Sequence, residues 1–320
     1  MMVDRNRKNF SYVSQLGILL GLIGAGLILG TLISVIAWLI MTGRPILEVE
    51  ADMLKPQYYN AVMMMQAVST IFMFFLPVYF FALICYRKPG KFMGLNTNVN
   101  FKQILILLAI LVLTFPLSGA LAELTKIIPL PLNWATKFKA MEDARALQEA
   151  ALININSFPK YIISLFVIGF LPGLVEEVCF RAGIQNILVR WLKGPWLAII
   201  ITSIIFSLVH ISYYGFLVRF ALGGILGLIF YYSGSIWLSV LFHFLYNGLQ
   251  VTALYVYTLS ATKNPKDIEE NFPVWAGVLA LVLIVYLFVK FRETSLLQKE
   301  KIKEDDEPYD DFHDWATAQS

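Results

Sequence analysis

The chain is poor in charge and in the side chains that build disulfide or metal centres. Charged residues make up 15% of its 320 residues, against about 25% in an average soluble domain. Its two cysteines, Cys85 and Cys179, both lie in apolar runs, so they indicate no disulfide framework and are too few for a zinc site. The net charge of +3 is too small to indicate a nucleic-acid partner. These shortages argue against a secreted scaffold and a nucleic-acid-binding protein.

The start of the chain is not expected to be a cleavable leader. The basic start of the chain resembles that of a signal peptide, but no Ala-x-Ala cleavage site follows the apolar run at 15–42. We therefore expect this run to be a retained first helix.

Apolar sequence is what the chain has in abundance. Hydrophobic residues make up 58% of it and the mean hydropathy is +0.68, which predicts a polytopic membrane protein. A membrane-spanning helix needs about 20 apolar residues. The sequence therefore predicts an all-α protein with about eight transmembrane helices, at 15–42, 60–86, 102–122, 161–191, 195–212, 216–232, 235–257 and 273–290.

Composition divides the chain into five expected segments. These are a cytoplasmic N-terminal segment at 1–14, three transmembrane helices with an amphipathic connection at 15–160, a catalytic core at 161–257, a last transmembrane helix at 258–290 and a charged cytoplasmic tail at 291–320. Lys and Arg near the span ends are more numerous on the side that carries both termini, so we expect both termini in the cytoplasm and the protein in the plasma membrane.

Ionisable side chains inside the apolar runs gather between residues 176 and 247. An ionisable residue at membrane depth is costly and usually faces the protein interior with a function. Glu177 and Arg181 are four apart and can pair along one helix face, which leaves Glu176, about 100° away, free to point toward a neighbour. A buried structural ion network is the other interpretation of this group.

Two histidines extend the group. The turn around Gly194 makes the fourth and fifth runs a hairpin, which puts Glu176 and His210 at similar depth, where they can share a water as a general-base pair. His243 and Asn247 share a face of the seventh run and can donate to an oxyanion, although interhelical hydrogen bonding is equally open. Counted from its turn, His243 lies only about 12 Å along its helix, against about 24 Å for His210, so their depths do not obviously agree.

These residues resemble the CPBP family of intramembrane proteases, which includes the type II CAAX prenyl endopeptidases and bacteriocin-processing and immunity relatives. The family's three motifs stand in order as EEVCFR at 176–181, FSLVH at 206–210 and HFLYN at 243–247, over about residues 160–250. The resemblance implies a membrane endopeptidase in which Glu176 and His210 activate water, and His243 and Asn247 stabilise the oxyanion. It implies supporting roles for Glu177, Arg181 and Phe206.

The sequence leaves open whether the reaction requires a metal ion. The family has been described both as a metalloprotease and as a glutamate-dependent protease. No H-E-x-x-H helix is present, which favours a reaction without metal or other cofactor, although Glu176, His210 and His243 remain a possible zinc ligand set. We expect a peptide or protein substrate at the lipid bilayer. The alternatives are a non-catalytic scaffold or bacteriocin-immunity protein and, less favoured, a proton-coupled transporter.

Overall fold

The computed structural model describes residues 6–96, 98–152, 155–259 and 272–305. Parts of four expected segments lie outside these residues, namely 1–5 of the N-terminal segment, 97 and 153–154 of the segment at 15–160, 260–271 of the segment at 258–290 and 306–320 of the tail. The described residues form helices and no strand, with one isolated bridge between Arg7 and Tyr86. The prediction of an all-α polytopic membrane protein is confirmed.

Within the described residues, six helical stretches are long and apolar enough to cross a membrane, so the expected number of eight is not confirmed. The two that fall short belong to the polar region. Helix α11 (Pro195–Leu208) is apolar but has 14 residues, or about 21 Å of helix, whereas the hydrocarbon core is about 30 Å thick. Helix α13 (Ile236–Leu259) has the length but carries His243, Asn247 and Gln250.

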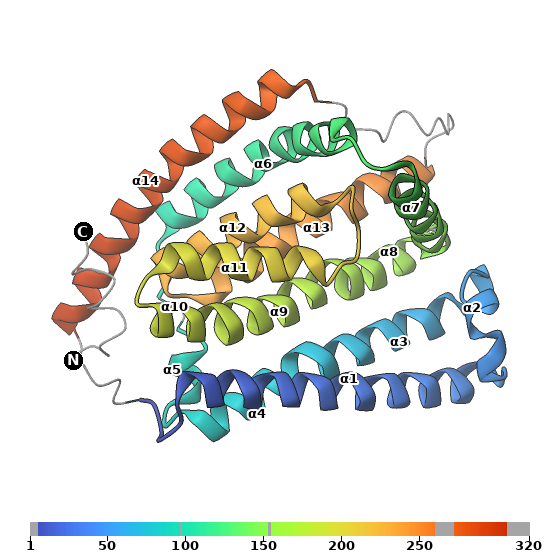
Figure 1. Cartoon of the computed structure of the whole chain (residues 1–320), viewed down its shortest axis with the longest axis horizontal. Helices are drawn as coiled ribbons and strands as arrows, with labels where there is room; N and C mark the ends of the chain where they lie inside the picture. Colours follow the sequence, from blue (N-terminus) through green and yellow to red (C-terminus); the bar gives the residue numbers. More distant parts are fainter. Residues whose placement is uncertain (1–5, 97, 153–154, 260–271, 306–320) are drawn as a thin grey trace.

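The helices lie in three layers (Figure 1). One outer layer holds α1 (Tyr12–Thr42) against α3 (Tyr59–Thr70) and α4 (Leu76–Cys85). The other holds α6 (Phe101–Ile127) beside α14 (Val274–Asp305). Between them lie the helices from α8 to α13, which contain all three motifs. Helix α14 continues past the expected span end at 290 as far as Asp305.

Both outer layers are fixed by specific contacts. In one, α1 passes so close to the π-helical turn Ile71–Phe75 that a Cβ at Gly26 would lie 2.2 Å from the Phe72 carbonyl oxygen, so only glycine fits. In the other, Gln103 of α6 donates to the Ser295 hydroxyl of α14 at 2.9 Å, which ties these long helices together near one end.

Short helical turns and one surface helix make up the connections. Helix α2 (Val49–Asp52) lies between two 3-10 turns, Ile46–Glu48 and Pro56–Tyr58, and α5 (Pro89–Phe92) precedes α6. Helix α7 (Leu132–Leu152) lies in the long connection, where the sequence predicts an amphipathic helix. It touches the loop between α11 and α12 (Phe216–Ser233). There Ser212 donates to the Glu142 carboxylate at 2.9 Å, and Tyr213 stacks on Phe138 with ring centroids 5.0 Å apart.

The fourth apolar run is one long helix of changing width. It consists of α8 (Phe158–Ser164), a π turn (Leu165–Phe170), α9 (Leu171–Glu177), a second π turn (Val178–Gln185) and α10 (Asn186–Leu192). The Pro172-Gly173 pair therefore does not unwind this helix. Proline lacks an N–H and clashes with the carbonyl four residues earlier, and the wide turn directly before Pro172 accommodates both.

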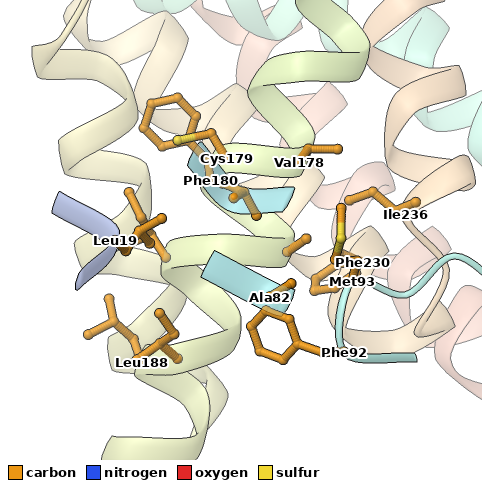
Figure 2. Close-up of a cluster of buried hydrophobic side chains, with 14 of the residues drawn as sticks. Leu19, Ala82, Phe92, Met93, Val178, Cys179, Phe180, Leu188, Phe230 and Ile236 are labelled. Atoms are coloured by element: carbon orange, nitrogen blue, oxygen red, sulfur yellow. The ribbon is translucent and has the colours of Figure 1, made fainter. Parts of the chain in front are cut away.

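The main hydrophobic core lies between α1, α4, the second π turn and the start of α13 (Figure 2). Phe92 and Met93, from the connection before α6, insert into it beside Phe230 and Ile236. Gly94 follows with φ +69°, where a Cβ would lie 3.0 Å from the Gly234 carbonyl oxygen. This connection also accepts a hydrogen bond from the Ile236 backbone at 2.9 Å, so it holds the α12–α13 turn inside the bundle end.

Candidate active site

An ion pair without solvent contact lies at the end of α9. The Arg181 Nε and the Glu177 Oε2 are 3.0 Å apart, and both side chains are 0% exposed. The pairing predicted from their spacing is therefore present. The N–H does not point along the line to the carboxylate oxygen, so the contact is one of charge more than of hydrogen bonding.

His243 of α13 lies against both carboxylates. Its Nδ1 is 3.0 Å from the Glu177 Oε1 and its Nε2 is 3.9 Å from the Glu176 Oε2. Because an ionised carboxylate only accepts, the Nδ1 carries the proton in the bond to Glu177. The Nε2 is then turned toward Glu176. Both glutamates thus approach the same imidazole ring, one at each nitrogen.

Phe206 packs at the centre of the group. Its ring meets the His243 ring edge-on at 6.0 Å and the His210 ring at 5.1 Å, while the Arg181 guanidinium lies 5.1 Å from its centroid. A cation over an aromatic face is attracted by the ring quadrupole. Phe206 therefore touches one ionisable residue from each of the three motifs and separates Arg181 from His210.

His210 lies just beyond the end of α11. Its Nδ1 is 2.8 Å from the Phe206 carbonyl oxygen, so Nδ1–H donates to its own helix and Nε2 is the acceptor nitrogen in the neutral ring. The next residue, Ile211, has φ +48°, which turns the chain sharply toward α12. His210 is half-buried, in contrast to the buried Arg181 and His243.

The difference in depth expected between His210 and His243 is closed by the start of α13. The α12–α13 turn begins inside the bundle end because the chain around Gly94 and Asn96 lies beneath it, where the Asn96 amide donates to the Gly234 carbonyl at 2.8 Å. His243 therefore reaches Phe206 although it is near the beginning of its helix. Asn247 follows one turn later and is half-buried.

The comparisons with known proteins point to the same segment. Residues 158–249 match the family described as type II CAAX prenyl endopeptidase Rce1-like. This part of the chain, called the Rce1-like segment below, is similar to that family, in agreement with the resemblance seen in its motifs. At the level of the family, the match implies an intramembrane protease that acts on a protein substrate in the membrane. Comparisons with curated proteins and with solved structures found no match.

The Rce1-like segment contains every predicted site residue, and the structure brings most of them into contact. Glu176, Glu177, Arg181, Phe206, His210 and His243 are linked by the contacts above; the catalytic roles assigned to them and to Asn247 stay predictions. Among the residues that the structure describes, no group of three His, Cys, Asp or Glu is arranged to hold a metal ion.

The bond between Glu177 and His243 is what the sequence interpretation missed in the Rce1-like segment. A signal for it exists in the spacing of Gly169 and Gly173, since two small residues four apart favour close helix contact. A Cβ at Gly173 would lie 3.0 Å from the Phe244 backbone nitrogen, and Gly169 faces Gly248 in the same way. Glu176 and Glu177 follow Gly173 by about one helical turn. The close approach of the two helices at Gly173 therefore places His243 beside both carboxylates.

Proposed function

We propose that this protein is an intramembrane endopeptidase that hydrolyses a peptide bond with water activated by Glu176 and His210. The observation that carries the proposal is the placement of His243 between two carboxylates, 3.0 Å from Glu177 and 3.9 Å from Glu176. In a purely structural network we would expect every carboxylate to have its own cation. Here Glu177 contacts both Arg181 and His243, whereas Glu176 lies only near the His243 Nε2.

In the proposed reaction Glu176 accepts a proton as the water oxygen bonds to the scissile carbonyl carbon. His210 accepts a hydrogen bond from this water through Nε2, since its Nδ1–H is bonded to the Phe206 carbonyl. The carbonyl electron pair moves onto oxygen. When the carbon–nitrogen bond then breaks, Glu176 returns its proton to the departing amine, so that it ends in its starting state.

The oxyanion is proposed to be stabilised by His243 and Asn247. In its imidazolium form, His243 keeps Nδ1–H on Glu177 and presents Nε2–H toward Glu176, where the carbonyl oxygen would develop charge. The Asn247 amide supplies a second donor from the next turn of α13. Arg181 balances the charge of Glu177, which fixes the tautomer and orientation of His243.

The proposed substrate is a membrane-bound protein segment that enters from the end of α11. His210, which is less buried than His243, lies at this end of α11. The loop beside it contacts α7 through Ser212 and Glu142. We further propose that the protein resides in the plasma membrane with both termini in the cytoplasm. The ends of α1 and α14 that lead to the termini are at the same end of the bundle, which supports this arrangement (Figure 1).

The decisive experiment compares wild type with Glu176→Gln in lipid nanodiscs. The probes are an internally quenched peptide ending in a farnesylated Cys-a-a-X sequence and the same peptide without the farnesyl group. Gln keeps the shape of the side chain but cannot accept the water's proton, so we expect cleavage to be abolished and the unfolding temperature to be unchanged. Glu293→Gln is the matched control, because Glu293 is 54% exposed on α14.

A second experiment does not require that the substrate be known, so it remains informative if neither peptide is a substrate. Membranes from cells that express wild type or Glu176→Gln are compared for new protein N-termini by mass spectrometry. N-termini that depend on Glu176 support the endopeptidase. Equal sets of N-termini, together with a folded protein that cleaves neither peptide, would instead favour a non-catalytic scaffold or immunity protein.

A further inference from the structure

Three buried side chains behind the proposed site leave polar atoms without a hydrogen-bond partner among the described residues. They are the Arg181 Nη1 and Nη2, the Gln185 Oε1 and the Thr202 Oγ1. Arg181 and Thr202 are 0% exposed and Gln185 is 1% exposed. Unpartnered polar atoms are rare in protein interiors, and three residues of this kind in one interface require a common explanation.

The three side chains face one interval between the second π turn and α11. Arg181 lies over Phe206, with 5.1 Å between guanidinium carbon and ring centroid. One turn further on, Gln185 lies beside Ile199, because a Cβ built on Gly227 would meet the Gln185 Oε1 at 2.8 Å and the Ile199 Cγ2 at 2.9 Å. Thr202 is three residues after Ile199 and four before Phe206, so it shares their helix face between the two contacts.

The Thr202 hydroxyl differs from those of other buried threonines in these helices. Thr70, Thr114 and Thr125 each donate to the carbonyl four residues earlier, at 2.8 Å. Thr202 makes no such bond although its helix offers the same carbonyl. Its hydroxyl is therefore left without the bond that the other threonines make, on the face of α11 that lies between the Ile199 and Phe206 contacts.

The hydrogen-bonding types of these atoms are complementary to water. The guanidinium only donates, the Gln185 Oε1 only accepts because its Nε2 already donates to the Gly227 carbonyl at 3.0 Å, and a hydroxyl does both. A water molecule accepts from Arg181 and donates to Gln185 and Thr202, which gives it the three bonds typical of a buried water. An anion fits less well, since Glu177 already balances the charge of Arg181.

We propose that the interface between the second π turn and α11 is an internal hydration site, in which Arg181, Gln185 and Thr202 bind at least one water molecule. This water holds the guanidinium behind Glu177, and Glu177 in turn orients His243. Thr202 and Gln185 are therefore positioning residues that act through Arg181. The hydration site rests on the buried polar atoms alone and does not depend on the proposed protease reaction.

The test is the sign of a stability change in full-length protein purified in one detergent. Thr202→Val removes the hydroxyl at nearly constant shape. With bound water, the variant leaves a hydrogen bond unmade, and we expect the unfolding temperature to fall by several degrees. Without water, the same change removes an unsatisfied polar atom, and the unfolding temperature would rise or stay constant, which would overturn the proposal.

Two further variants make the result specific. Thr114→Val is the matched control, because Thr114 is equally buried but its hydroxyl bonds to its own helix, so we expect little change. Thr202→Ser restores the hydroxyl and should restore the wild-type unfolding temperature. A fall in Thr114→Val as large as in Thr202→Val would assign the effect to packing and contradict the hydration site.

A combined variant examines whether Gln185 and Thr202 share the same water. If they do, the losses caused by Gln185→Met and Thr202→Val should not add, because the first change already disrupts the site. Additive losses would contradict a shared water. Where cleavage is measurable, Thr202→Val should lower kcat about tenfold with KM unchanged, since the effect reaches the reaction only through Arg181; an unchanged kcat would refute the positioning role.

Discussion

Removal of the Arg181 charge should destabilise the protein far more than removal of a surface charge. The Glu177–Arg181 pair is wholly buried at 3.0 Å, and Arg181→Met leaves the Glu177 carboxylate with only the hydrogen bond from His243. Breaking a buried pair from one side costs about 3–5 kcal/mol, because the remaining charge stays out of water. At about 1.4 kcal/mol per factor of ten, the folded-to-unfolded ratio should fall by roughly two to four orders of magnitude.

The assay is thermal unfolding of four purified proteins in the same detergent: wild type, Arg181→Met, Glu177→Gln and the double variant. Each single change strands a charge, whereas the double change removes both, so the double variant should be more stable than the worse single variant. Gln at position 177 still offers an oxygen to His243, which separates the loss of charge from the loss of that hydrogen bond.

A surface pair supplies the control. Lys126 and Glu123 of α6 are closer, at 2.7 Å, but their side chains are 58% and 35% exposed. Exposed pairs contribute about 0–1 kcal/mol, so Lys126→Met should hardly change the unfolding temperature. If Arg181→Met unfolds at the same temperature as Lys126→Met, the buried pair does not hold the helix in the way described.

Three further outcomes are expected. Asn247→Ala should lower kcat by about 100–1,000-fold with little effect on KM, and Asn247→Asp should be worse because a carboxylate repels the oxyanion; a change in KM alone would contradict the oxyanion role. Chelators should not inhibit cleavage, and elemental analysis of active protein should find no stoichiometric zinc; one zinc lost together with activity would show a metalloprotease. Hydrogen bonds from Lys55 and Arg44 hold the pKa of Asp52 below its ordinary value of about 3.9, so its contribution to stability is full above that value and is lost as the pH falls through the lower folded pKa. Asp52→Asn should therefore flatten the acid side of a plot of unfolding temperature against pH, and an unchanged slope would contradict this.

The helical architecture could be predicted because apolar length and turn residues are local signals. The run expected at 216–232 is α12 (Phe216–Ser233), and the hairpin at Gly194 is present with Lys193 in a left-handed conformation. The end of the last helix was not predictable in this way. Phe291 and Ser295 are buried against the bundle. Tertiary contacts therefore stabilise α14 beyond residue 290, in a stretch whose many charged residues predict a tail.

The candidate site was predictable in its members and less so in its contacts. Glu177 and Arg181 meet because four residues make about one turn, which is visible in the sequence. The approach of Glu177 to His243 depends on the depth at which α13 starts. Hydrogen bonds with Gly94 and Asn96, which precede the α12–α13 turn by more than 130 residues, set that depth. Such long-range packing leaves little trace in the order of apolar and polar residues.

The wide turn at Leu165–Phe170 sets the direction of the residues that follow it. An α-helix advances by about 100° per residue, and a wider turn advances by less. Ordinary α-helical hydrogen bonding over the same residues would therefore rotate everything beyond the turn by about 100° relative to α8, which Tyr59 anchors through the Ser164 hydroxyl at 2.6 Å. Glu176 and Glu177 would then face a different neighbour. A local change of helix width thus determines which way both carboxylates point.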